Sequence, residues 1–217
     1  MLIGVGTSIC GGSAIAAVAP VICAEDEDVT RAISTIFLFN IIAVFIFPVL
    51  GRLMGMTDMD FGMWAGTAIN DTSSVVAAGT AWSNAAGDNT ALKFATIVKL
   101  TRTLMIVPVT LILAFYTSKK MKEAKGGSFK FTKVFPWFVL FFIAAALAKT
   151  FLGIPGEATS ILVQTGKFVI TMAMVAIGLN TNLKSLFAHG IKPLALGCLC
   201  WLTVAIVSLV VQRFIAI

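Results

Sequence analysis

Five long apolar stretches constrain this chain more than any other feature, because each is long enough to cross a lipid bilayer as a helix. A span needs about 20 mostly apolar residues. The stretches are residues 29–50, 89–116, 134–152, 159–180 and 191–216. With 59% hydrophobic and only 12% charged residues, the chain has too little polar surface for a water-soluble globule. The sequence therefore predicts an all-α, polytopic integral membrane protein.

Two further stretches, residues 1–23 and 59–82, are long enough to span but are interrupted. Residues 6–13 break the first and residues 66–74 the second, because Gly, Ser, Asn and Asp compete with the helical backbone. We expect about seven membrane segments, two of them broken into short helices. The sequence leaves open whether these two segments cross the membrane or turn back, although Arg52 favours crossing.

The two interruptions resemble each other at a fixed offset of 60 residues. The matching pairs are Gly6 and Gly66, Thr7 and Thr67, Ile9 and Ile69, Ser13 and Ser73, and Ala17 and Ala77. Coincidence is the alternative in a chain so rich in small residues. Paired interruptions of this kind are typical of transporter sites at the membrane midplane.

Helix ends at such breaks offer sites for ions of either sign. A helix that begins inside the membrane presents free N–H groups that attract an anion, and one that ends there presents carbonyl groups that attract a cation. Ser13 and either Thr72 or Ser73 are placed to cap helix starts. The preceding helices are expected to end near Ser8 and Ala68. The structural alternative is that the small residues only allow close helix packing.

Charged residues inside the spans favour an anion. Asp71 is the only carboxylate that we place deep in a span, where an ionisable group is costly and is kept mainly for function. Lys99 and Arg102 share one helix face at i, i+3 spacing, and Lys167 is central in residues 159–180. The region is therefore net positive. The alternatives are an ion pair between Asp71 and Lys99 or Arg102, or snorkelling of the cations to an interface.

The candidate site combines polar and small residues of both interruptions with two cations. The candidate substrate-binding residues are Thr7, Ser8, Cys10, Gly11, Gly12, Ser13, Asn70, Thr72, Ser73, Ser74, Lys99 and Arg102. Asp71 is the candidate for coupling substrate movement to H⁺ or Na⁺. We expect no cofactor and no metal. No enzyme class fits, because the only His, His189, lies in a predicted loop and no second deep Asp is present.

The basic segment Lys119–Lys133 gives the orientation. It carries six lysines against one acid, Glu123, and so belongs in the cytoplasm by the positive-inside rule. The chain is expected to form a single membrane domain, residues 1–217, in which residues 117–133 separate spans 1–116 from spans 134–217. The net charge of +6 comes from such loops and isolated cations, not from a solvated basic stripe, which argues against a nucleic-acid partner.

Four segments together resemble the YeiH family, proposed sulfate exporters of bacterial inner membranes. They are residues 6–22, 62–79, 98–102 and 173–181. The chain differs from the family pattern at Asn70, where we expect His, and at Ser74, where we expect Gln. A proton step that depends on this His is therefore in doubt. The resemblance implies a fold similar to the cation/proton antiporter and anion transporter superfamily, with inverted repeats and broken helices.

The resemblance also implies several membrane helices before residue 1, so we expect this chain to be the C-terminal part of a longer fold. A partner or a second copy of the chain would then complete it. Our hypothesis is an inner-membrane secondary transporter of a small anion, which the resemblance implies to be sulfate or a related sulfur oxyanion. The alternatives are a cation/proton antiporter that uses Asp71 as ion carrier, or a truncated membrane subunit that does not transport.

Overall fold

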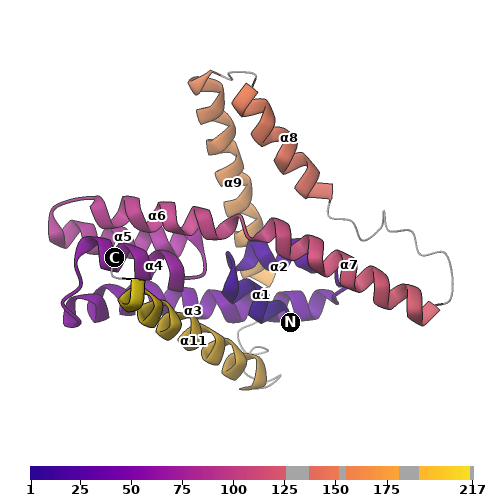
Figure 1. Ribbon diagram of the computed structural model, residues 1–217, viewed down its shortest axis with the longest axis horizontal. Coiled ribbons are helices and arrows are strands. Elements are labelled where there is room, and N and C mark those ends of the chain that lie inside the picture. Colours follow the sequence, from indigo (N-terminus) through magenta and orange to yellow (C-terminus); the bar gives the residue numbers. More distant parts are fainter. Residues whose placement is uncertain (126–136, 152–154, 181–190, 216–217) are drawn as a thin grey trace.

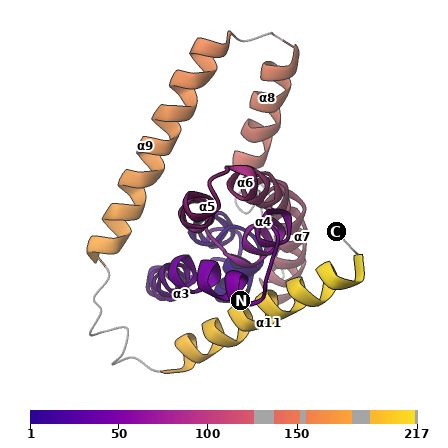
Figure 2. The same ribbon diagram turned by 90° about the vertical axis from the view of Figure 1, so that its left-hand side faces the viewer.

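The computed structural model describes residues 1–125, 137–151, 155–180 and 191–215, which form helices and no strands. The helices are α1 (Leu2–Ser8), α2 (Gly12–Val18), α3 (Asp26–Leu53), α4 (Asp58–Ala68), α5 (Thr72–Ala86), α6 (Thr90–Thr103), α7 (Ile106–Lys125), α8 (Trp137–Phe151), α9 (Gly156–Asn180) and α11 (Ile191–Ile215). Helices α1 to α7 and α11 form one elongated bundle, from which α8 and α9 project as a pair (Figures 1 and 2).

Three helical segments are long and apolar enough to cross a membrane. They are Asp26–Leu53, Thr90–Lys119 and Ile191–Phe214. Each coincides with a span predicted from the sequence. The predicted spans 134–152 and 159–180 are not among the three found in the described ranges, so the total of seven membrane segments stays a prediction.

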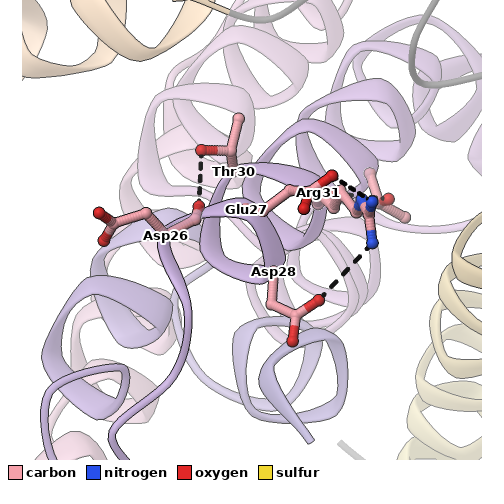
Figure 3. A network of polar contacts seen from close by, with 6 residues as sticks. Asp26, Glu27, Asp28, Thr30 and Arg31 are labelled. Carbon is pink, nitrogen blue, oxygen red and sulfur yellow. Dashed lines mark hydrogen bonds and ion pairs between the residues drawn. The ribbon is translucent and has the colours of Figure 1, made fainter. Parts of the chain in front are cut away.

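The first turn of α3 is strongly acidic. Arg31 forms an ion pair with Glu27 and lies 3.8 Å from a carboxylate oxygen of Asp28, while the Thr30 hydroxyl donates to the carbonyl oxygen of Asp26 (Figure 3). Acidic side chains at a helix start interact favourably with the positive end of the helix dipole. The three acidic side chains, Asp26, Glu27 and Asp28, are exposed at the start of α3.

A bend at Leu104 divides the segment Thr90–Lys119 into α6 and α7. Pro108 has no N–H group to donate to the carbonyl oxygen of Leu104, so the helical ladder is interrupted here. The backbone tightens instead, with Leu104 N–H donating to Thr101 O at 3.2 Å and Met105 N–H to Arg102 O at 3.1 Å. The sequence predicted an unbroken span in this region.

Helices α4 and α5 fold back on each other as a helical hairpin whose tip is residues 69–71. Phe61, in the first turn of α4, stacks on Trp82 near the end of α5 with ring centroids 4.1 Å apart. Trp82 Nε1 also donates to Asp58 Oδ1 at 2.6 Å. The start of α4 and the end of α5 therefore lie together, and the interrupted segment 59–82 turns back.

Helices α1 and α2 form a second, shorter hairpin with residues 9–11 at its tip. A methyl group placed on Gly6 of α1 would lie 2.9 Å from the Ile15 side chain of α2, so the two helices are in direct contact. Gly11 at the tip has φ +72°, a backbone conformation that favours glycine. The interrupted segment 1–23 therefore also turns back.

The long helices run beside both hairpins in opposite directions. Along α3, Ile36 lies against Gly6 of the first hairpin, and Gly51 lies against Phe61 at the open end of the second. Along α6 and α7 the order is reversed, since Ala91 lies against the start of α4 and Ala114 packs with Val21 after α2. The two hairpins thus enter the bundle from opposite ends, and their tips meet between the long helices (Figure 1).

Helix α11 runs parallel to α3 and covers α4. Gly197 lies against Thr35 near the start of α3. Further along, Trp64 Nε1 donates to Ala205 O at 3.1 Å, and Gln212 Nε2 donates to Asp60 O at 3.0 Å. The end of α11 therefore lies at the open end of the α4–α5 hairpin.

Glycines bring α4 into backbone contact with α6. A methyl group on Gly62 would lie 3.0 Å from Ala91 O, and one on Gly66 would lie 2.6 Å from Ala95 O. Small residues four positions apart allow this close approach of two helices. Lys99 lies one helical turn beyond Ala95. The close contact between α4 and α6 therefore places the Lys99 side chain at the tip of the α4–α5 hairpin.

Candidate functional site

The helix ends at the two tips follow the 60-residue offset found in the sequence. Helix α1 ends at Ser8 and α4 at Ala68, while α2 begins at Gly12 and α5 at Thr72. Equivalent ends are thus 60 residues apart in both cases. The two tips are structurally equivalent as well as similar in sequence.

Lys99 lies between the two tips, and its side chain is 0% exposed. Its Nζ donates to the carbonyl oxygen of Ile9 at 2.8 Å and to that of Ile69 at 3.0 Å. Ile9 and Ile69 directly follow α1 and α4 and are equivalent at the 60-residue offset. One buried cation therefore binds the same position of both hairpins.

Arg102 repeats this arrangement one turn further along α6. Its Nη2 donates to Thr7 O at 2.5 Å, its Nη1 donates to Thr67 O, and its Nε donates to Ser8 O at 3.0 Å. Thr7 and Thr67 are again equivalent at the 60-residue offset. Arg102 thus holds the last turns of α1 and α4 together.

The two cations supply what the ends of α1 and α4 lack. A helix end leaves carbonyl groups without partners and carries a partial negative charge, both of which are costly inside a membrane. In the structure, Lys99 and Arg102 bind these carbonyl groups. The sequence alone also allowed a cation such as sodium to bind at these helix ends. Both ion pairs found among the described residues belong to Arg31, so neither Lys99 nor Arg102 forms one with Asp71 there.

Asp71 caps the start of α5. Its carboxylate accepts hydrogen bonds from the Ser73 backbone N–H at 3.0 Å and from the Ser73 hydroxyl. Its own backbone N–H donates to Asn40 Oδ1 at 3.3 Å. A methyl group on Gly11, which precedes α2, would lie 3.6 Å from Asp71 Cβ. The residues that precede α2 and α5 therefore face each other across the tips.

Two buried asparagines flank Asp71. Asn40 of α3 is 2% exposed and Asn70 is 1% exposed. Asn40 Nδ2 and both polar side-chain atoms of Asn70 have no hydrogen-bond partner. Such groups are rare inside proteins and call for an explanation. Asn70 was predicted as a site residue, whereas Asn40 was not, although an Asn within the apolar stretch 29–50 is a signal that points to it.

The other predicted residues surround the tips in several environments. The Thr7 hydroxyl donates to Ile3 O at 2.8 Å within α1. The exposed Ser13 donates to the sulfur of the buried Cys10 at 2.9 Å. Ser8 is exposed and Gly12 is buried. Thr72, Ser73 and Ser74 form the first turn of α5.

The structure does not place the side chains of Lys167 and His189, two residues considered in the sequence analysis. Lys167 lies in α9, but its side chain lies outside the described residues. His189 and residues 126–133 of the basic segment lie outside them as well.

The three apolar helices and the buried cations define a helical integral membrane protein. The chain belongs to the family described as Conserved hypothetical protein 698, the YeiH/UPF0324 family, whose model matches residues 1–197. The resemblance seen in the sequence is thereby confirmed. No solved structure matches the chain.

Three similar curated proteins are named UPF0324 membrane protein. The one from Fusobacterium nucleatum subsp. nucleatum is 49% identical over 232 residues, covering 100% of this chain and 66% of that protein. The one from Streptococcus agalactiae serotype V is 52% identical over 217 residues, covering 99% and 64%. The one from Streptococcus mutans serotype c is 49% identical over 222 residues, covering 100% and 65%. The chain thus spans slightly less than two thirds of the length of these relatives.

Proposed function

We propose that this chain forms the substrate site of a secondary transporter for a small anion, coupled to H⁺ or Na⁺ at Asp71. One observation carries the proposal: Lys99 and Arg102, from one helix, bind equivalent carbonyl groups at the tips of both hairpins. Non-helical backbone at membrane depth is tolerated where it is buried in protein or lines a cavity. Paired tips of this kind are characteristic of transporter sites.

The sum of charges at the tips favours an anion. Lys99 and Arg102 contribute two positive charges and Asp71 one negative charge. Each helix end contributes about half a charge, so the two carbonyl ends and the two N–H ends cancel. The tips therefore carry about one net positive charge, which a small anion would neutralise. Sulfate or a related sulfur oxyanion is the substrate class implied by the YeiH resemblance.

In this proposal the hairpins are re-entrant and open toward opposite faces of the inner membrane. Helices α3 and α6–α7 cross the membrane in opposite directions, and α11 crosses parallel to α3. If the basic segment Lys119–Lys133 is cytoplasmic, the α1–α2 hairpin enters from the cytoplasm and the α4–α5 hairpin from the other face. Inverted repeats of this kind allow a central site to open to each side in turn.

Uptake of radiolabelled oxyanions into proteoliposomes tests the proposal. We expect the chain to support uptake that depends on an imposed proton or sodium gradient, and Asp71→Asn to abolish this dependence. Glu25→Gln is the matched control, because it removes an exposed carboxylate at the start of α3. The proposal is wrong if no oxyanion is taken up, or if Asp71→Asn behaves as Glu25→Gln does.

A cation/proton antiporter is the second candidate, and the unpaired Oδ1 of Asn70, the residue that precedes Asp71, favours it. Carboxylate and amide oxygens are ligands for hard cations. Sodium flux against a proton gradient, with no oxyanion uptake by the same proteoliposomes, would select this candidate.

A further inference from the structure

We infer that Asn40 and Asn70 complete the substrate site at the start of α5, and that this site takes an oxyanion carrying a hydrogen atom, of the hydrogen phosphate type. The inference rests on the proposed function of a small-anion transporter, and within that class it favours anions that carry a hydrogen over the sulfate implied by the YeiH resemblance. Its evidence is three buried polar atoms without a hydrogen-bond partner, Asn40 Nδ2 and Asn70 Nδ2 and Oδ1. The charge of the two hairpin tips and their hydrogen-bond donors and acceptors add to it.

The amide of Asn40 has a fixed orientation. Its Oδ1 accepts a hydrogen bond from the Asp71 backbone N–H at 3.3 Å, so its Nδ2 must face away from that bond. This Nδ2 has no partner and lies 3.7 Å from the point that a methyl group on Gly11 would occupy. Asn40 therefore presents a free N–H donor to the space between the two tips.

Asn70 adds both a donor and an acceptor. Its side chain is 1% exposed, and neither Nδ2 nor Oδ1 has a partner. Leaving a buried polar atom without a partner costs about 1–3 kcal/mol. Three such atoms beside one aspartate are expensive for a membrane protein unless a ligand uses them.

Space for a ligand atom exists beside Gly11. A methyl group there would make only ordinary contacts, 3.6 Å from Asp71 Cβ and 3.6 Å from Ile36 Cγ2. The same space borders Asp71, the residue that caps the 15-residue helix α5 and accepts a hydrogen bond from the Ser73 N–H; the other N–H groups of the first turn have no helical partner. An anion at a helix start is favoured by these N–H groups and by the dipole.

The available groups specify the hydrogen-bonding pattern of the ligand. Asn40 Nδ2, Asn70 Nδ2 and the start of α5 are donors, which oppose a bare cation and require acceptor oxygens. Asn70 Oδ1 is an unpaired acceptor, and the Asp71 carboxylate keeps acceptor capacity beside its two bonds from Ser73, so both favour a ligand that carries a hydrogen. A hydrogen-bearing oxyanion satisfies both sets. Sulfate has no hydrogen, so one of its oxygens would face a carboxylate.

Hydrogen phosphate and sulfate are a matched pair of probes, because they share shape and charge and differ by one hydrogen. We would measure the affinity of the purified full chain in detergent for each, by calorimetry and by the shift in Tm, at slightly alkaline pH, where the dianion HPO4²⁻ predominates. A site that hydrogen-bonds a substrate O–H rejects an analogue without it, so we expect phosphate to bind at least about tenfold more tightly than sulfate.

Two variants test the role of Asn40. Asn40→Asp keeps an oxygen for the Asp71 N–H, replaces the free donor with an acceptor and adds a negative charge close to Asp71, so phosphate binding should be lost. Asn40→Leu should also lose phosphate binding. It removes the unpaired donor but also the acceptor of the Asp71 backbone N–H, so the two effects oppose each other and the Tm without ligand should change little. Ser83→Ala is the control, since Ser83 of α5 also has a buried unpaired oxygen but lies far from the tip. Its phosphate binding should be unchanged.

The inference is overturned if sulfate binds as tightly as phosphate, or if both Asn40 variants bind phosphate as the unchanged chain does. The proposed function fails separately, when no oxyanion is taken up into proteoliposomes. Sulfate uptake that is insensitive to both Asn40 variants would therefore refute this inference alone.

Discussion

At the scale of single residues, Lys99 and Arg102 are the most informative side chains. Their i, i+3 spacing correctly predicted a shared helix face. Their partners were not predictable, because the carbonyl groups come from hairpin tips that only the tertiary fold brings to α6. A hydropathy pattern shows which side chains are apolar or charged. It does not show which backbone carbonyl groups are left without a helical partner. Asn40 was missed for a related reason: its role depends on contact with Asp71, 31 positions away.

Lys99→Met should strongly destabilise the protein. The substitution keeps the length and removes the charge, leaving the carbonyl groups of Ile9 and Ile69 buried without partners. We expect a loss of roughly 2–5 kcal/mol in the free energy of unfolding. Lys93→Met is the control in the same helix, since Lys93 is exposed, and should change stability by less than about 0.5 kcal/mol. Equal thermal unfolding of the two variants in detergent would contradict the role given to Lys99.

At the scale of elements, the ends of the short helices were predictable and their direction was not. Gly, Ser, Asn and Asp predicted interruptions within residues 6–13 and 66–74, where α1 and α4 end and α2 and α5 begin. A straight broken helix and a hairpin have the same hydropathy, so the sequence left the choice open. Contacts such as Phe61 on Trp82 decide it.

Gly66→Ala should separate α4 from α6. The added methyl group would lie 2.6 Å from Ala95 O and 2.8 Å from Val98 Cβ, which forces the backbones apart. Overpacking of this kind costs about 1–3 kcal/mol. In Gly4→Ala the new methyl group meets no atom within 4 Å, so the Tm should stay equal or rise slightly. An unchanged Tm for Gly66→Ala would show that the close contact does not hold the tip in place.

At the scale of the whole molecule, helices α1 to α7 of the described bundle form two related units. Each unit has a helical hairpin followed by a long helical segment, and the sequence offset continues beyond the tips. Further identical pairs at 60 residues are Asp28 and Asp88, Thr30 and Thr90, Pro48 and Pro108, and Val49 and Val109. Because α3 and α6–α7 run in opposite directions, the units have inverted orientations, as the inverted-repeat transporters do.

This architecture predicts the sidedness of the loops. Single cysteines at Met54 and Asp88, placed in a chain whose native cysteines are replaced, should react with an impermeant maleimide from the same side of the membrane. A cysteine at Glu25 should react from the opposite side. If the segment 59–82 crossed the membrane, Met54→Cys and Asp88→Cys would react from opposite sides.

In the proposed function, the hairpin tips form the site of a transported oxyanion. The most direct test of this site is the reaction rate of a single cysteine at Ser73, an exposed residue in the first turn of α5, with an impermeant maleimide in proteoliposomes. We expect phosphate to slow this reaction in a saturable manner and to leave the reaction of a Glu25→Cys control unchanged. A Ser73→Cys rate that is independent of every oxyanion tested would contradict the proposed function.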